Sequence, residues 1–157
     1  MGLSGSLRAH SGTVILGVED GCVSVTGLVL GVATVATSAH VVLLAGLAGA
    51  AAAATSMACG QYLSDETEHR AAVAGASWML AASAVSAALP ALPFAFFALA
   101  PARIIAVCLS VVLLILLGLG RAHVADSSRF RTIAETVGIA ALAALAAVGI
   151  SLVANHA

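Results

Sequence analysis

Two adjacent carboxylates, Glu19 and Asp20, lie inside an otherwise apolar stretch, ILGVEDGCVSVTGLVLG, which begins at Ile15. An acidic residue at the centre of a membrane helix costs about 2.5 to 3.5 kcal/mol, and such residues usually serve an ion path or a proton relay. Asp20 is the stronger candidate. Glu19 is longer and one residue nearer the helix start, where it could reach the interface and where the helix dipole favours acids.

Met57 and Gln61 form a second candidate pair, because residues four apart share one face of a helix. Carboxylate and amide oxygens are hard ligands, whereas a thioether is soft. A site that combines them suits a borderline ion such as Fe²⁺ better than Ca²⁺ or Mg²⁺. A lone methionine in a membrane helix is usually packing. Met79 has no polar neighbours at helical spacing, and we assign it to packing.

The composition identifies the elements that must position these side chains. The 157 residues are 62% hydrophobic and only 8% charged, whereas about 25% is usual in soluble domains. The apolar residues form long runs, so the chain is expected to be an integral membrane protein. The net charge of -1 implies no nucleic-acid partner. Cys22, Cys59 and Cys108 are isolated from one another and are expected to be buried small hydrophobic residues.

Five segments are long enough to cross a bilayer, which takes about 20 apolar residues. They predict an all-α, multi-pass protein of the cell membrane, with a single transmembrane domain over 1–157 and no soluble domain. We interpret the first segment as a retained span rather than a signal peptide. The expected spans cover about 13–36, 41–63, 71–89, 102–120 and 132–154.

The arginines predict the orientation, because positive charge collects on the cytoplasmic side of membrane proteins. An inside N-terminus places all the arginines except Arg103 in the cytoplasm. The C-terminus is then outside. The cytoplasmic arginines are Arg8, Arg70, Arg121, Arg129 and Arg131.

Other polar side chains favour structural explanations. The loop SDETEHR carries Asp65, Glu66, Glu68 and His69, which could collect cations, although a solvated turn is the preferred interpretation. Gly and small polar residues recur on one face of each of the first two spans. Such faces allow close helix packing, with or without a polar seam between them. Arg131 and Glu135 are four apart and are expected to form an ion pair.

Two stretches resemble the first two helices of the vacuolar iron transporter family: VILGVEDGCVSVTGLVLGVA and LLAGLAGAAAAATSMACGQYLSDETEHR. Family members share a D-G motif early in helix one and an S-M-A-x-G-E-Y-x-S motif that ends helix two. Asp20-Gly21 matches the first motif, and residues 56–64 match the second at all but one fixed position. LPALPF, after the third span, is similar to the end of the family's third helix. The resemblance covers all five spans but is specific only in the first two.

The resemblance implies a homodimer of five-helix protomers that exports Fe²⁺ or Mn²⁺ from the cytoplasm in exchange for protons. The metal path would lie near the dimer interface, lined by the first two helices. The positions that match Asp20 and Met57 would hold the ion within the membrane. No cofactor is implied beyond the transported metal.

The chain departs from the family pattern in two ways: a missing domain, and a glutamate that is missing from helix two. Members commonly carry a glutamate-rich cytoplasmic domain between helices two and three, where this chain has only SDETEHR. Gln61 stands where the family usually has glutamate, and Glu19 where it usually has an uncharged residue. Glu19 could replace the charge that is missing at Gln61, provided that both face the same seam. The two adjacent acids point about 100° apart on a helix, so Glu19 could miss that seam.

The leading hypothesis is a transporter in which Asp20, Met57 and the Gln61 carbonyl bind the metal, with Glu19 nearby. The alternative is a non-transporting membrane module that pairs with or anchors a partner protein, since both departures from the family also fit that role. An enzyme is not expected, because no nucleophile–base pair or phosphate loop has a recognisable spacing.

Overall fold

A computed structural model describes residues 10–65, 69–124 and 127–156. Within these ranges five helices are long and apolar enough to cross a membrane. They are α2 (Ser11–Val35), α3 (Ala39–Ser64), α4 (His69–Ala88), α6 (Leu99–Val124) and α7 (Arg129–His156). The all-α prediction is therefore confirmed. Glu66 and Glu68 of the predicted acidic loop, and Arg8, lie outside the described residues.

The short connections follow from local chemistry. Ser38 begins α3 as its N-cap, accepting a hydrogen bond from the His40 backbone N–H at 3.2 Å. Helix α4 ends before Pro90, which has no N–H to continue the ladder. The predicted proline-rich connection contains one further short helix, α5 (Pro93–Phe96), with Pro93 in its first turn.

The ends of the fourth and fifth spans differ from the prediction. Helix α6 continues past Gly120 to Val124, and α7 begins at Arg129, so most of the predicted polar loop is helical. Hydropathy alone marks where apolar residues stop, whereas a helix can continue while its backbone hydrogen bonds are satisfied. Arg121 and His123 favour this extension, because cations stabilise the last turn of a helix.

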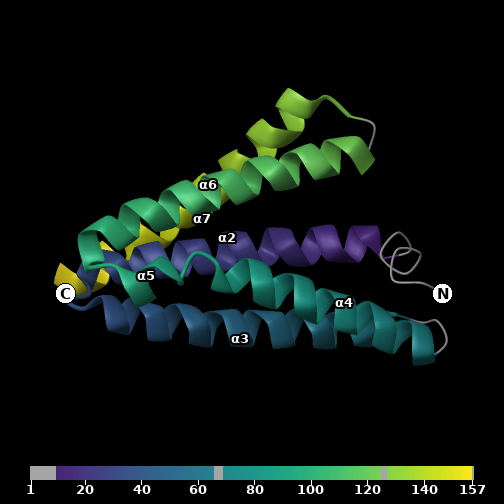
Figure 1. The fold of residues 1–157 in the computed structure, drawn as a ribbon, viewed down its shortest axis with the longest axis horizontal. Coiled ribbons are helices and arrows are strands. Elements are labelled where there is room, and N and C mark those ends of the chain that lie inside the picture. Colours follow the sequence, from purple (N-terminus) through teal and green to yellow (C-terminus); the bar gives the residue numbers. More distant parts are fainter. Residues whose placement is uncertain (1–9, 66–68, 125–126, 157) are drawn as a thin grey trace.

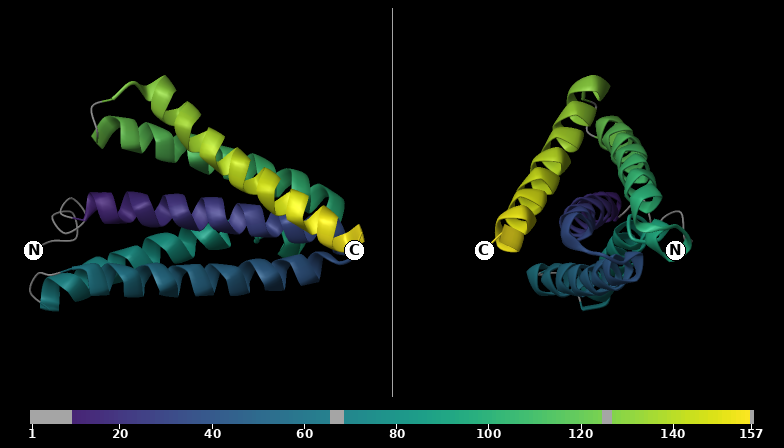
Figure 2. Two further views of the ribbon diagram at one scale, coloured as in Figure 1. Left: turned by 180° about the vertical axis from the view of Figure 1, so that it is seen from behind. Right: turned by 90° about the vertical axis from the view of Figure 1, so that its left-hand side faces the viewer.

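Helix α2 is the central element of an elongated bundle. It lies between α3 and α4 on one side and the α6–α7 hairpin on the other (Figure 1; end-on view in Figure 2). In an apolar 18-residue segment of each helix, 44% of the α2 segment is buried inside the protein, whereas only 6% of the α7 segment is buried. The hairpin leans away from α3 and α4 toward its turn, near the beginning of α2 (Figure 1).

Small residues set the spacing around α2. A Cβ on Gly17 would lie 2.9 Å from Met79 Sδ and 3.1 Å from Ser83 Oγ of α4. The Ser83 hydroxyl also donates to the Gly17 carbonyl at 3.1 Å. Helix α4 therefore fills part of the small-residue face of α2, which for this part favours close packing over a polar seam. Met79 is 1% exposed, in line with its assignment to packing.

The cysteines are placed differently from the prediction. Cys22 is fully buried between α2, α6 and α7, beside Leu114 and Ala140. Cys59 and Cys108 are exposed on the protein surface, and all three thiols are free. The prediction of burial is wrong for these two because a membrane helix can present apolar side chains to lipid as readily as to the protein core.

Candidate metal site

The two adjacent acids face different elements. Glu19 is directed toward the hairpin, where its Oε1 lies 2.7 Å from Nη1 of Arg121 on α6. The same Nη1 donates to Oγ1 of Thr136 on α7 at 3.2 Å. The side chains of Arg121 and Glu19 are 34% and 21% exposed, and Thr136 is fully buried. This ion pair therefore connects three helices in a partly buried setting.

Asp20 lies on an open face of α2. Its half-buried carboxylate accepts a hydrogen bond from the Ser24 hydroxyl at 3.2 Å. Among the described residues, neither ion pair of the structure involves it. Helical spacing places it on a stripe with Leu16 and Leu28, whose exposed fractions are 50% and 38%. Because α2 begins at Ser11, Asp20 is about 14 Å along the helix.

Met57 reaches the same depth as Asp20 from the neighbouring helix. The antiparallel helices α2 and α3 meet where the side chain of Leu28 packs directly on Gly49. Eight residues from that contact, toward the same end of the bundle, are Asp20 on α2 and Met57 on α3. Both helices rise about 1.5 Å per residue, so the two side chains start at the same level. Met57 is half-buried.

Gln61 lies one turn beyond Met57 on the same helix and leans toward α4. Its Cγ and Nε2 are each 3.7 Å from the position of a Cβ on Gly75, and Oδ2 of Asp65 is at the same distance. Glu19 instead contacts Arg121 on α6. The structure therefore does not bring Glu19 to Gln61, which the compensation hypothesis requires.

The described part of the acidic loop adds no ready-made metal cluster. His69, exposed at the start of α4, is hydrogen-bonded through Nδ1 to the Tyr62 hydroxyl at 3.1 Å. Over the ranges that the structure describes, no group of three or more His, Cys, Asp or Glu side chains could hold a metal ion together. A metal bound near Asp20 would therefore need the thioether and carbonyl donors of α3, or further donors from outside the protomer.

Arg121 is the functional candidate that sequence reasoning missed. It was expected in a cytoplasmic loop, whereas it lies in the last turn of α6 and points toward α2. The sequence did not show where α6 ends. Because α6 includes residue 121, the Arg121 side chain can reach Glu19, whose role the sequence left open. In contrast, the predicted Arg131–Glu135 pair is confirmed, with Nε and Oε1 2.8 Å apart.

Comparisons with known proteins find likeness along most of the chain. A sequence model described as the VIT family matches residues 12–75 and 65–152. The VIT-like transporter 1a of Glycine max is 46% identical over 55 residues, which are 35% of this chain and 27% of that protein. The vacuolar iron transporter homolog 3 of Oryza sativa subsp. japonica is 46% identical over 50 residues, or 32% and 20%. The matched segments thus span about a quarter or less of these curated relatives.

Proposed function

The chain belongs to the VIT family, and we propose that it is a transporter that moves Fe²⁺ or Mn²⁺ out of the cytoplasm in exchange for protons. The family membership and the five membrane-crossing helices make it a multi-pass membrane protein. Its relatives are named as transporters, one of them for vacuolar iron. Cell-membrane placement, the metal and the direction of transport are parts of this proposal.

The open position of Asp20 is the observation that carries the proposal. A carboxylate about 14 Å along a membrane helix, bonded only to a serine hydroxyl among the described groups, is costly unless it serves an ion or proton. The adjacent Glu19 has an arginine partner and is stabilised without a metal. Asp20 is therefore the acid whose charge is still free to bind a cation.

The donors that we assign to the ion are the Asp20 carboxylate, the Met57 thioether and the Gln61 carbonyl. The equal depth of Asp20 and Met57 supports this set, and so does the half-buried position of all three side chains. A mixed oxygen and sulfur set favours Fe²⁺ or Mn²⁺ over the hard Mg²⁺ and Ca²⁺ only through the thioether. Since a carboxylate binds metal in its ionised form, metal and proton compete at Asp20, which couples their movements.

A second copy of the chain is the proposed cover for the stripe Leu16, Asp20, Ser24 and Leu28. In a lone protomer Leu28 packs on α3, whereas Leu16 and Ser24 are exposed. The half-buried Asp20 carboxylate is partly exposed to lipid, where a charge is unfavourable. Packing the stripe against its equivalent in a homodimer removes Asp20 from lipid and brings a second set of donors to the same place. Exposed small residues on the neighbouring α3, such as Ala52, Ser56 and Gly60, permit that close approach.

Arginine placement supports the proposed direction. Arg70, Arg121, Arg129 and Arg131 lie where α4 and α7 begin and α6 ends, whereas Arg103 lies near the beginning of α6, at the other end of the bundle. The four-to-one bias makes the arginine-rich end cytoplasmic. The N-terminus is then inside and the C-terminus outside, and Asp20 is reached from the cytoplasm.

The test is metal uptake into inside-out vesicles under an imposed pH gradient. Asp20→Asn is expected to abolish pH-driven Fe²⁺ and Mn²⁺ uptake, because an amide neither exchanges the coupling proton nor supplies the charge. Asp20→Glu keeps the carboxylate and is expected to retain measurable uptake. Wild-type uptake by Asp20→Asn would contradict the mechanism. Absence of uptake by the wild-type protein would favour the non-transporting module instead.

A further inference from the structure

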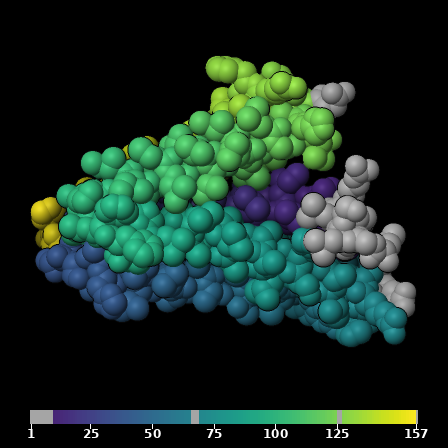
Figure 3. Space-filling view, viewed as in Figure 1, coloured from purple at the N-terminus to yellow at the C-terminus, as the bar shows by residue number. Residues whose placement is uncertain are grey.

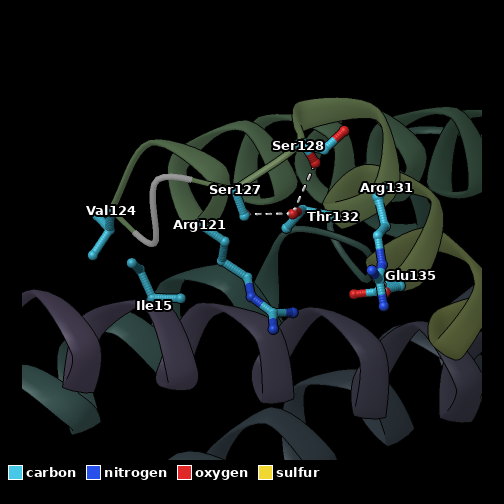
Figure 4. A pocket seen from close by; sticks show the side chains of 8 residues that line it. All are labelled: Ile15, Arg121, Val124, Ser127, Ser128, Arg131, Thr132 and Glu135. Carbon is cyan, nitrogen blue, oxygen red and sulfur yellow. Dashed lines mark hydrogen bonds and ion pairs between the residues drawn. The ribbon is translucent and has the colours of Figure 1, made fainter.

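A cavity whose lining residues are mainly polar or charged lies between the end of α6, the beginning of α7 and the first turns of α2. It has a volume of about 480 Å³, within the usual range for small-molecule sites. Figure 4 shows Arg121 reaching from the hairpin toward α2, with Ser127, Ser128 and Thr132 near the turn and Arg131 beside Glu135. Ile15 and Val124 complete its lining with apolar side chains.

The two arginines retain hydrogen-bond donors for a ligand. Each guanidinium has five N–H groups. Arg121 uses Nη1 for Glu19 and Thr136, and Arg131 uses Nε for Glu135. The other nitrogens of both side chains have no hydrogen-bond partner among the described groups. Among the described residues, Glu19 and Glu135 are the acids paired with the arginines, from α2 and α7, and a group that bridges both guanidinium ions would leave these ion pairs intact.

An apolar groove lies along the same turns of α2 as this cavity. It has a volume of about 360 Å³ and lies between α2, α4 and α6. Val14 and Val18 line the groove, whereas Ile15, between them in sequence, lines the cavity. Figure 3 shows the first turns of α2 at the bottom of a hollow between α6 and α4. Trp78 and Leu113 close the groove from α4 and α6.

We propose that the cavity binds the phosphate of an anionic phospholipid headgroup, with an acyl chain in the apolar groove. Arginine pairs bind phosphate through several parallel hydrogen bonds, and basic pockets between membrane helices are known headgroup sites. The apolar groove favours a lipid over a free phosphate compound, because only a lipid supplies both parts. The site is at the end of the bundle that we propose to be cytoplasmic, where the leaflet is anionic.

The test is lipid retention by the full chain in native mass spectrometry, together with its melting temperature in neutral detergent. Phosphatidylglycerol is expected to be retained and to stabilise, whereas phosphatidylcholine is not. Arg131→Gln is expected to weaken phosphatidylglycerol retention about fivefold, the usual effect of one basic residue near a membrane surface. Arg131 is 82% exposed in its side chain, so this variant is expected to fold.

Arg70→Gln is the matched control, because it removes an exposed arginine near the same end of the bundle that lines neither cavity. Its retention of phosphatidylglycerol is expected to equal that of the wild type. Ala81→Phe, which fills the groove, is expected to lower retention without removing charge. Equal losses of retention in Arg70→Gln and Arg131→Gln would overturn the proposal, since they would show that retention depends on surface charge alone and not on the cavity.

Glycerol 3-phosphate and inorganic phosphate distinguish a lipid from a free anion. If either raises the melting temperature as much as phosphatidylglycerol does, the lipid assignment is wrong. Equal retention of phosphatidylcholine would overturn it as well. None of these readouts depends on metal transport, so their failure leaves the proposed transport function untouched.

Discussion

Glu19 and Asp20 are neighbours in sequence, yet they occupy opposite kinds of environment. The face of α2 that carries Glu19 meets the hairpin, and its charge is matched by Arg121 and supported through Thr136. The face that carries Asp20 is open, and Ser24 is the hydrogen-bond partner of its carboxylate. The difference shows that two adjacent acids in one helix need separate explanations: one stabilises the bundle, and the other retains unused charge.

The largest expected effect is that stabilisation by metal depends on Asp20 and not on Glu19. In thermal unfolding, Fe²⁺ or Mn²⁺ at 100 times its Kd is expected to stabilise the wild type by about 2.7 kcal/mol. Asp20→Asn is expected to lose this metal-dependent stabilisation. Glu19→Gln is expected to keep it, although this variant is less stable than the wild type without metal. Loss of the metal-dependent gain in Glu19→Gln would instead support the compensation hypothesis and place Glu19 at the metal.

The next effect tests the structural role of Glu19. Arg121→Gln leaves the Glu19 carboxylate without its cation in a setting that is only 21% exposed. Breaking a buried pair on one side costs about 3 to 5 kcal/mol, and partial exposure lowers the expected loss here to about 2 kcal/mol. Unfolding in mixed micelles measures it.

The double variant Arg121→Gln with Glu19→Gln controls for the unpaired charge. It is expected to recover about half of the stability lost in Arg121→Gln, because no isolated carboxylate remains. If the double variant is less stable than the wild type by the sum of the two single-variant effects, the two side chains do not interact in the folded protein.

The smallest effect compares two methionines at similar depth. Met57→Leu is expected to weaken metal binding about tenfold, or 1.4 kcal/mol, because it removes the thioether and keeps the volume. Met79→Leu, buried against Gly17, is expected to cost less than about 1.5 kcal/mol of stability and to leave metal binding unchanged. Equal metal binding by the two variants would remove Met57 from the site.

The fold was predictable from the sequence because bilayer thickness fixes the length of an apolar helix. All five spans are at their expected places, and the Arg131–Glu135 pair follows from spacing along one helix. The helix ends were less predictable. Arg121 and Arg129 belong to helices although hydropathy assigned them to a loop, because capping and the helix dipole, rather than apolarity, determine where a helix stops.

The partners of the candidate site could not be predicted from helical periodicity. Periodicity placed Gly17, Asp20 and Gly21 on one small face, but it does not identify which helix covers each part of it. Helix α4 covers both glycines, whereas Asp20 stays open. In the same way, helix geometry predicts that the Glu19 and Asp20 side chains point about 100° apart. It does not predict that Glu19 pairs with Arg121, which is far away in sequence.

Helix α6 is fastened to α2 near both of its ends by an arginine. At one end Arg121 pairs with Glu19, and at the other Nη2 of Arg103 donates to the Ala33 carbonyl in the last turn of α2. The two anchors are about 27 Å apart along α6. Contacts near both ends of α6 oppose both sliding and tilting of this helix against α2. We therefore expect α2 and α6 to keep a fixed register relative to each other.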